Sequence, residues 1–114
     1  MAETVFGKIL AGEIPAERVY EDAFCIVIRD IAPQAPTHLL VIPKEPIATV
    51  ADLGDEHKEL VGHMTVVASR VAEKEGLADD GYRLVWNCKD AGGQEVPHIH
   101  LHVLGGRQMK WPPG

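Results

Sequence analysis

Short apolar runs divide most of the chain into predicted strands. Residues 24–29 (FCIVIR) and 38–42 (HLLVI) are apolar on both faces, which is typical of strands buried in a sheet. Residues 30–37 (DIAPQAPT) join them through two prolines, which predicts a loop and an antiparallel pair of strands. Further strands are expected at residues 18–21, 82–87 and 98–104, the first of them at an edge of the sheet.

Helical periodicity occurs in two places. Between residues 55 and 75 the apolar side chains recur at three- and four-residue spacing, with Asp55 placed to cap the start and Gly76 the end. A shorter helix is expected over residues 4–11, where Thr4 can act as the N-cap. Strands on both sides of one long helix predict an α+β fold, with an antiparallel sheet of about five strands and one long and one short helix.

Composition narrows the classes of function. The chain has 114 residues, of which 46% are hydrophobic, and it shows no repeat or linker, so one domain over residues 1–114 is expected. A net charge of −6 disfavours a function in binding the nucleic-acid backbone, but it is compatible with binding a small phosphate-bearing ligand. The chain has two cysteines, no secretory-signal pattern and no long apolar run, which predicts a cytoplasmic protein without membrane contact.

Candidate chemistry concentrates near the C-terminus. His98, His100 and His102 alternate with apolar residues, so one face of the predicted strand carries three imidazoles. Buried imidazoles need partners, which a ligand, a metal ion or a hydrogen-bond network can supply. A metal site is a real alternative, although the outer two α-carbons of such a strand lie about 13 Å apart.

The loop before the histidines favours phosphate over metal. Gly92 and Gly93 permit backbone conformations that aim successive N–H groups at one point, and such a nest binds phosphate oxygens. A histidine can attack phosphorus, and a second histidine can protonate the leaving group. Together the loop and the histidines predict chemistry at a phosphorus atom.

Several motifs resemble one known family. The run HIHLHVL (98–104), the preceding GGQEV (92–96), the following GGRQMKWPPG (105–114) and the segment RDIAPQAPTHLLVIPK (29–44) are similar to the histidine-triad (HIT) family, in particular its nucleotide-binding branch. The similarity runs from Phe6 to Gly114 with the motifs in the same order and spacing. It implies a single HIT domain with a C-terminal tail at residues 105–114.

The resemblance also implies roles for individual residues. His100 would be the nucleophile, His102 would contact the phosphate and assist the leaving group, and His98 and His38 would support the site. Asp30 would bind the ribose hydroxyls, a role open to a carboxylate that accepts from two hydroxyls. An apolar slot would hold the base, built from Phe6, Ile9, Ile28 and Ile31, and the phosphate would be held by Asn87, Gly93, Gln94, Glu95 and Val96.

Two positions depart from the best-known members of the family. Glu95 stands where many of them carry serine, and a carboxylate cannot donate a hydrogen bond unless it is protonated. Pro97 replaces a commonly aromatic residue, which is tolerable at the start of a strand.

The implied activity is that of a purine nucleoside phosphoramidase acting through a nucleotidyl-histidine intermediate, without metal or cofactor. The other nitrogen of His100 would then carry its proton and donate a hydrogen bond to a nearby backbone carbonyl. A dinucleoside polyphosphate hydrolase, a metal-dependent hydrolase and a nucleotide-binding module with little catalysis are the alternatives. The resemblance further implies a homodimer joined edge to edge, and the tail with Trp111 is expected to shape the partner's substrate site.

Overall fold

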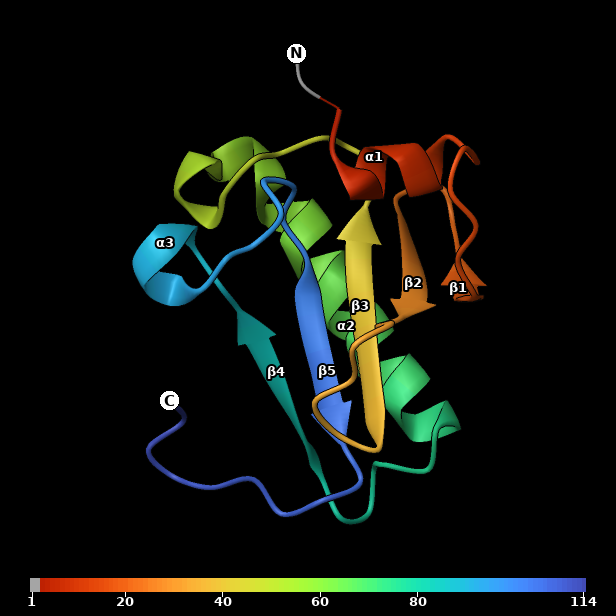
Figure 1. Cartoon of the computed structure of the whole chain (residues 1–114), viewed down its shortest axis with the longest axis vertical. Helices are drawn as coiled ribbons and strands as arrows, with labels where there is room; N and C mark the ends of the chain where they lie inside the picture. The colour runs from red at the N-terminus through yellow and green to blue at the C-terminus, as the bar shows by residue number, and fades with distance from the viewer. Residues whose placement is uncertain (1–2) are drawn as a thin grey trace.

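The computed structural model describes residues 3–114 as one five-stranded sheet with helices on both faces. The strands are β1 (Arg18–Glu21), β2 (Cys25–Arg29), β3 (Thr37–Pro43), β4 (Tyr82–Trp86) and β5 (Leu101–Gly105). Their order is β1-β2-β3-β5-β4, and every neighbouring pair is antiparallel (Figure 1). The predicted α+β class, antiparallel sheet and number of strands are confirmed.

The long helix covers one face of the sheet. Helix α2 (Lys58–Lys74) follows a short 3₁₀ turn at Asp55–His57, so Asp55 begins that turn and does not cap α2 directly. Met64, Val67, Ala68 and Val71 of α2 pack onto the side chains that the strands present on this face. The strand residues in this core are Cys25, Val27, Leu39, Val41, Leu101 and Val103, all of them buried.

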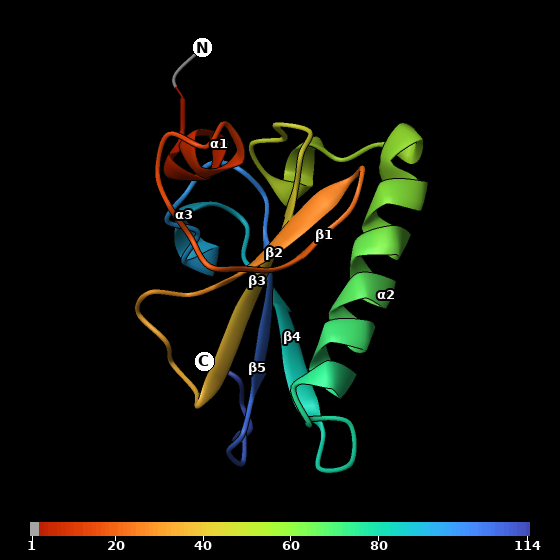
Figure 2. The same ribbon diagram turned by 90° about the vertical axis from the view of Figure 1, so that its right-hand side faces the viewer.

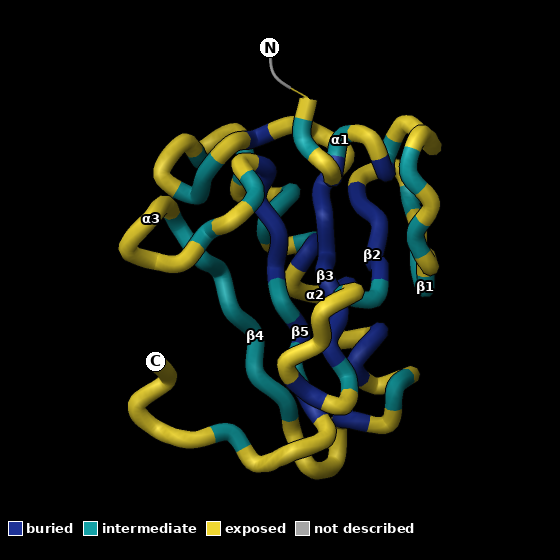
Figure 3. The backbone as a smooth tube through the Cα atoms, in the orientation of Figure 1, coloured by how far each residue is buried: buried dark blue, intermediate teal, exposed yellow. Residues whose placement is uncertain are grey.

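The opposite face carries the short helix α1 (Val5–Leu10), as the edge-on view shows (Figure 2). Thr4 caps α1 as expected, since its hydroxyl oxygen accepts from the N–H of Gly7 at 3.0 Å. Phe6 and Ile9 of α1 pack on Ile26, Ile28, Leu40 and Ile42 in a second, smaller core. Strand residues therefore alternate between the two faces. Strands β2 and β3 are buried on both faces, whereas β5 is fully buried only on the α2 side (Figure 3).

Two local predictions need correction. Strand β5 begins at Leu101, three residues later than expected, because residues 98–100 do not pair with a neighbouring strand. The N–H of Ile99 donates instead to the carbonyl of Ile47 at 2.8 Å. In addition, the glycine-rich connection contains a short helix, α3 (Lys89–Gly92), and a 3₁₀ turn that was not predicted lies at Val50–Asp52.

Within residues 3–114, no helix combines the length and apolar character needed to cross a membrane.

Candidate active site

Four imidazoles gather on the face of the sheet that α1 covers. His38 lies on β3 and His102 on β5, at positions that alternate with residues of the α2-side core. His98 and His100 lie in the extended segment leading into β5, and both are buried. The ring centroid of His102 lies 5.0 Å from that of His100 and 5.1 Å from that of His38. The four histidines expected in the site are thus brought together, although only His102 of the triad lies within the strand.

Backbone carbonyls fix two of the rings. The Nε2 atom of His98 lies 2.8 Å from the carbonyl oxygen of Pro43, and Nδ1 of His100 lies 2.8 Å from the carbonyl oxygen of His98. A carbonyl only accepts, so each of these ring nitrogens carries the proton in the neutral imidazole. His100 therefore presents Nε2 with a free lone pair, and the expected backbone acceptor for its other nitrogen is present.

A second chain of hydrogen bonds fixes His102. The backbone N–H of Gln34 donates to Nδ1 of His38 at 3.0 Å, which places the His38 proton on Nε2. That Nε2 lies 2.8 Å from Nδ1 of His102 and donates to it. The remaining proton of neutral His102 is then on Nε2, a buried atom with no hydrogen-bond partner among residues 3–114. The site thus offers a lone pair on His100 and an unused donor on His102.

Burial keeps these rings neutral. It lowers the pKa of His100 below its ordinary value, while the bond to the His98 carbonyl and the nearby Asp30 and Glu95 carboxylates act in the opposite direction. Burial, with neighbouring His100 and His38, lowers the pKa of His102 to about 4. Burial likewise lowers the pKa of His38 and of His98. At neutral pH each ring is therefore uncharged, and its tautomer determines which of the two nitrogens carries the proton.

Asp30 lies beside the imidazoles. One carboxylate oxygen accepts from the N–H of Ala32 at 2.8 Å, which closes the start of the proline loop. The other lies 3.5 Å from Nε2 of His38. Asp30 thus caps its loop and also adds negative charge to the site.

The apolar residues expected around a base divide into two groups. Phe6, Ile9 and Ile28 are buried in one cluster, with Val96 packed against it, and the Phe6 ring stands 4.9 Å from the His100 ring. Ile31 is fully exposed, with 100% of its surface accessible, and it lies outside this cluster.

The loop at residues 93–96 is organised from within. Gly93 adopts a φ of +79° at the end of α3, and its N–H donates to the carbonyl of Asp90. The N–H of Gln94 donates to the carbonyl of Lys89 at 3.0 Å, so neither amide is directed at an external ligand. Within residues 3–114, the N–H groups of Glu95 and Val96 donate no hydrogen bond, so these two amides are available to an external acceptor.

The side chain of Gln94 holds the same loop together. Its amide nitrogen donates to the carbonyls of Ala48 and Val96, at 2.7 and 2.9 Å, and its oxygen accepts from the N–H of Lys89. Asn87 is half-buried directly after β4, and a Cβ placed on Gly92 would lie 3.7 Å from its carbonyl carbon. Sequence reasoning could not assign Gln94 to this bracing role, because its acceptors are backbone carbonyls.

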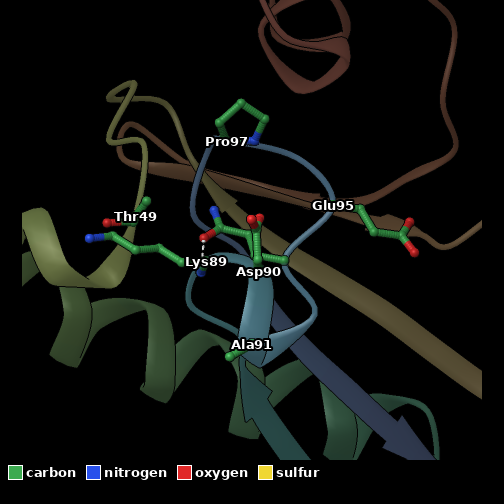
Figure 4. Close-up of a pocket in the computed structure, with 7 residues that line it drawn as sticks. Thr49, Lys89, Asp90, Ala91, Glu95 and Pro97 are labelled. Atoms are coloured by element: carbon green, nitrogen blue, oxygen red, sulfur yellow. Dashed lines mark hydrogen bonds between the residues drawn. The ribbon is translucent and has the colours of Figure 1, made fainter.

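A cavity of about 610 Å³ lies beside this loop, outside the histidine cluster (Figure 4). In the close-up the side chains of Lys89 and Glu95 leave the loop on opposite sides. None of the four site histidines lines this cavity, whose walls are Thr49, Lys89, Asp90, Ala91, Gln94, Glu95 and Pro97.

Metal-ligand geometry is present in two groups of described residues. Asp30, His38 and His102 offer atoms within 4.8 Å of one another, as do Asp22, Cys25 and His63. In the first group, however, His38 and His102 already share a hydrogen bond. In the second, the Asp22 carboxylate already accepts from Tyr20, Phe24, Cys25 and His63. His98 and His100 belong to neither group.

Comparison with known proteins places the chain in a family. The family model for the HIT domain matches residues 11–109. This chain belongs to the HIT family. The HIT match includes every site histidine and the whole loop from Lys89 to Val96.

Relatives within the HIT family are close in sequence and structure. The purine nucleoside phosphoramidase of Escherichia coli K12 is 53% identical over 107 residues, which cover 94% of this chain and 90% of the relative. An uncharacterized HIT-like protein of Synechococcus elongatus is 54% identical over 112 residues, covering 98% of this chain and 97% of that protein. The crystal structure of a HIT family hydrolase from Legionella pneumophila superposes with a TM-score of 0.95 at 57% identity, covering 96% of this chain and 98% of that one.

Proposed function

We propose that this HIT protein is a purine nucleoside phosphoramidase, which hydrolyses the P–N bond of a nucleoside 5′-phosphoramidate. The observation that carries the proposal is that two neighbouring rings offer complementary groups. His100 offers a lone pair on Nε2, and His102 offers an N–H on Nε2 that has no partner within residues 3–114. Similarity to the Escherichia coli phosphoramidase over 94% of the chain supports the same reaction class.

The reaction has two steps. In the first, Nε2 of His100 forms a bond to phosphorus, and the P–N bond breaks with its electron pair leaving on the amine. The amine takes up a proton, for which His102 Nε2–H is the donor. In the second step, water attacks phosphorus from the side opposite His100 and gives a proton to the Nε2 lone pair that His102 gained in the first step. The bond between phosphorus and His100 breaks with its electron pair returning to the ring, and the nucleoside monophosphate leaves.

Charge is balanced by fixed groups. As the His100 ring becomes cationic in the adduct, its Nδ1–H retains the His98 carbonyl as acceptor. Negative charge on the phosphate oxygens would be met by His102 Nε2–H and by the free N–H groups of Glu95 and Val96. In the proposed pose the purine base lies toward Phe6 and Ile9, with Ile28 behind these two side chains and Ile31 over the base. The Asp30 carboxylate accepts hydrogen bonds from the ribose hydroxyls. Asn87 and the Gly93–Gln94 backbone border the phosphate.

The experiment that tests this function is rapid quenching with an adenosine phosphoramidate, followed by intact-protein mass spectrometry. We expect an added nucleotidyl mass on the wild type and none on His100→Asn, with almost no turnover by that variant. The wild type should hydrolyse a diadenosine polyphosphate more slowly than the adenosine phosphoramidate. Inversion at phosphorus, or activity that a chelator removes and zinc restores, would contradict the proposed mechanism.

We further propose a cytoplasmic homodimer joined through β4. This strand is an edge of the sheet, and all five of its residues are only half-buried. The unpaired backbone N–H and C=O groups of an edge strand can form hydrogen bonds with a strand of another chain. Trp111, 83% exposed in the tail at residues 105–114, would then reach the partner's site. Sedimentation should show a dimer at micromolar concentration, and a stable monomer would contradict this assembly.

A further inference from the structure

An exposed arginine of the tail is connected to the active site through one residue of the proline loop. Nε and Nη2 of Arg107 both donate to the carbonyl oxygen of Gln34, at 3.2 and 3.0 Å. The N–H of the same Gln34 donates to Nδ1 of His38, whose Nε2 donates to His102. Four residues thus form one continuous path from the surface to the buried donor of His102.

The glycines before Arg107 make this contact possible. Gly105 ends β5, where it pairs with Thr37 of β3. Gly106 adopts a φ of +92°, and a Cβ at this position would lie 2.8 Å from Cβ of Pro36. Position 106 therefore requires glycine, because the backbone turns there in close contact with the proline loop. This turn brings the Arg107 guanidinium next to Gln34.

The Gln34 N–H has a specific consequence for the histidines. A neutral His38–His102 pair has two possible proton arrangements, because the shared hydrogen bond can run in either direction. In the alternative arrangement, Nδ1 of His38 would carry a proton and face the N–H of Gln34, donor against donor. His102 would then donate from Nδ1 and present a bare lone pair on Nε2. The N–H of Gln34 favours the first arrangement, and so does the Asp30 carboxylate oxygen 3.5 Å from Nε2 of His38.

We propose that Arg107 is a positioning residue that holds the Gln34 backbone in place, so that the His38 tautomer keeps a proton on His102 Nε2. Arg107 acts at a distance from the substrate, through two backbone groups and one ring. The statement about proton position stands on the hydrogen bonds alone. Only the catalytic use of that proton rests on the proposed function.

The first test reads the tautomers directly, without substrate. Ring ¹⁵N shifts and couplings of labelled histidine, recorded at neutral pH, distinguish protonated from unprotonated ring nitrogens. In the wild type we expect Nε2 to be protonated on both His38 and His102. In Arg107→Ala we expect a mixture of both tautomers on both rings, and in Arg107→Lys, which keeps the charge but loses the paired donors, an intermediate mixture.

Arg83→Ala is the matched control. Arg83 also donates to a backbone carbonyl of the tail, that of Lys110 at 2.9 Å, but within residues 3–114 it makes no hydrogen bond to Gln34. Its removal should leave the tautomers of the wild type. Unchanged tautomers in Arg107→Ala, or in Arg107→Lys if the alanine variant does not fold, would overturn the proposal. Equal changes in Arg83→Ala would overturn it as well, since they would reflect general loosening of the tail.

The second test measures what the proton does. For a phosphoramidate of a strongly basic amine, Arg107→Ala should lower kcat by about fivefold, in line with the modest net contribution of hydrogen bonds at an exposed site. For a leaving group that needs no proton, the rate should change by less than about twofold. Altered tautomers with equal losses for both substrates would overturn the donor role of His102 in the proposed function, while the positioning role of Arg107 would stand.

Discussion

The Phe6 ring stands edge-on to the imidazole of His100, with 4.9 Å between the ring centroids and an interplanar angle of 75°. Phe6 is also 6.2 Å from the His98 ring, and only 7% of its surface is exposed. One side chain of the short helix α1 therefore packs the small core and also removes water from two site histidines.

Phe6→Ala should affect both stability and pH dependence. Loss of a buried phenylalanine costs about 3 kcal/mol or more of unfolding free energy, which urea titration would measure. Water admitted beside His100 should raise its pKa toward the ordinary value, because burial is the main cause of its lowering. The acid limb of the rate profile should move to higher pH. Phe6→Leu, which keeps most of the apolar volume, should show a smaller change in both measurements, and an unmoved limb in the alanine variant would contradict this explanation.

Catalysis should persist to pH values below the ordinary histidine pKa. In the proposed mechanism neutral His100 is the nucleophile, and burial lowers its pKa below the ordinary 6.5. As the pH falls, the rate should therefore hold through about pH 6.5 and decline only below it. A kcat/KM profile with a limb at or above the ordinary value would contradict the neutral state derived from burial.

Stability should decrease as the pH falls through the same range. His102 has a pKa of about 4 in the folded chain against an ordinary value of 6.5, so the unfolded chain binds more protons between these limits. The loss begins near the ordinary pKa and levels off below the folded one. Its slope is about 1.4 kcal/mol per pH unit for each histidine that stays neutral. Urea unfolding of His102→Gln should show a shallower pH dependence than that of the wild type.

Replacement of His102 should separate leaving groups. In His102→Ala the donor on Nε2 is lost, and catalysis by a positioned acid is worth roughly a hundredfold or more. We expect a loss of this size with a basic amine, and a much smaller loss with a leaving group that departs as a stable anion. The control is His57→Ala, since His57 pairs with Glu45 at 3.1 Å, away from the site. Equal losses for both substrates would exclude proton donation by His102.

Glu95 should tune His100 through charge. Its carboxylate raises the pKa of His100, against the larger effect of burial. Glu95→Gln removes that charge, so the acid limb should move to lower pH, and the shift should be small because the side chain is exposed. Lys89→Gln, which changes a charge on the opposite side of the loop, serves as the comparison. A shift to higher pH in Glu95→Gln would contradict this assignment.

Much of the fold follows from local pattern in the sequence. The runs that became β2 and β3 are apolar throughout, and the spacing of Met64, Val67 and Val71 determines the buried side of α2. The start of β5 did not follow, because alternation of histidines and apolar residues continues through His98 and His100 without strand pairing. What keeps that segment extended is a backbone contact between Ile99 and Ile47, and a backbone contact leaves no trace in side-chain pattern.

The candidate site shows the same division. Side-chain identity and the family resemblance predicted that His38, His98, His100 and His102 act together, and they do lie together. The direction of each hydrogen bond depends on the carbonyls of Pro43 and His98 and on the N–H of Gln34. Any residue type supplies a carbonyl, and any except proline supplies an N–H. The glycine loop was expected to present a full nest of amides, but the end of α3 uses two of them.

Strand β3 sends Leu39 and Val41 to the α2 side and His38 and Leu40 to the other. A shift of its pairing by a single residue would exchange these sets. His38 would enter the apolar core under α2, while a leucine would take its place beside His102. A shift of β3 by one residue therefore disrupts the apolar interior and the histidine cluster together. Selection for catalytic activity at this site therefore also selects for the correct pairing register of β3.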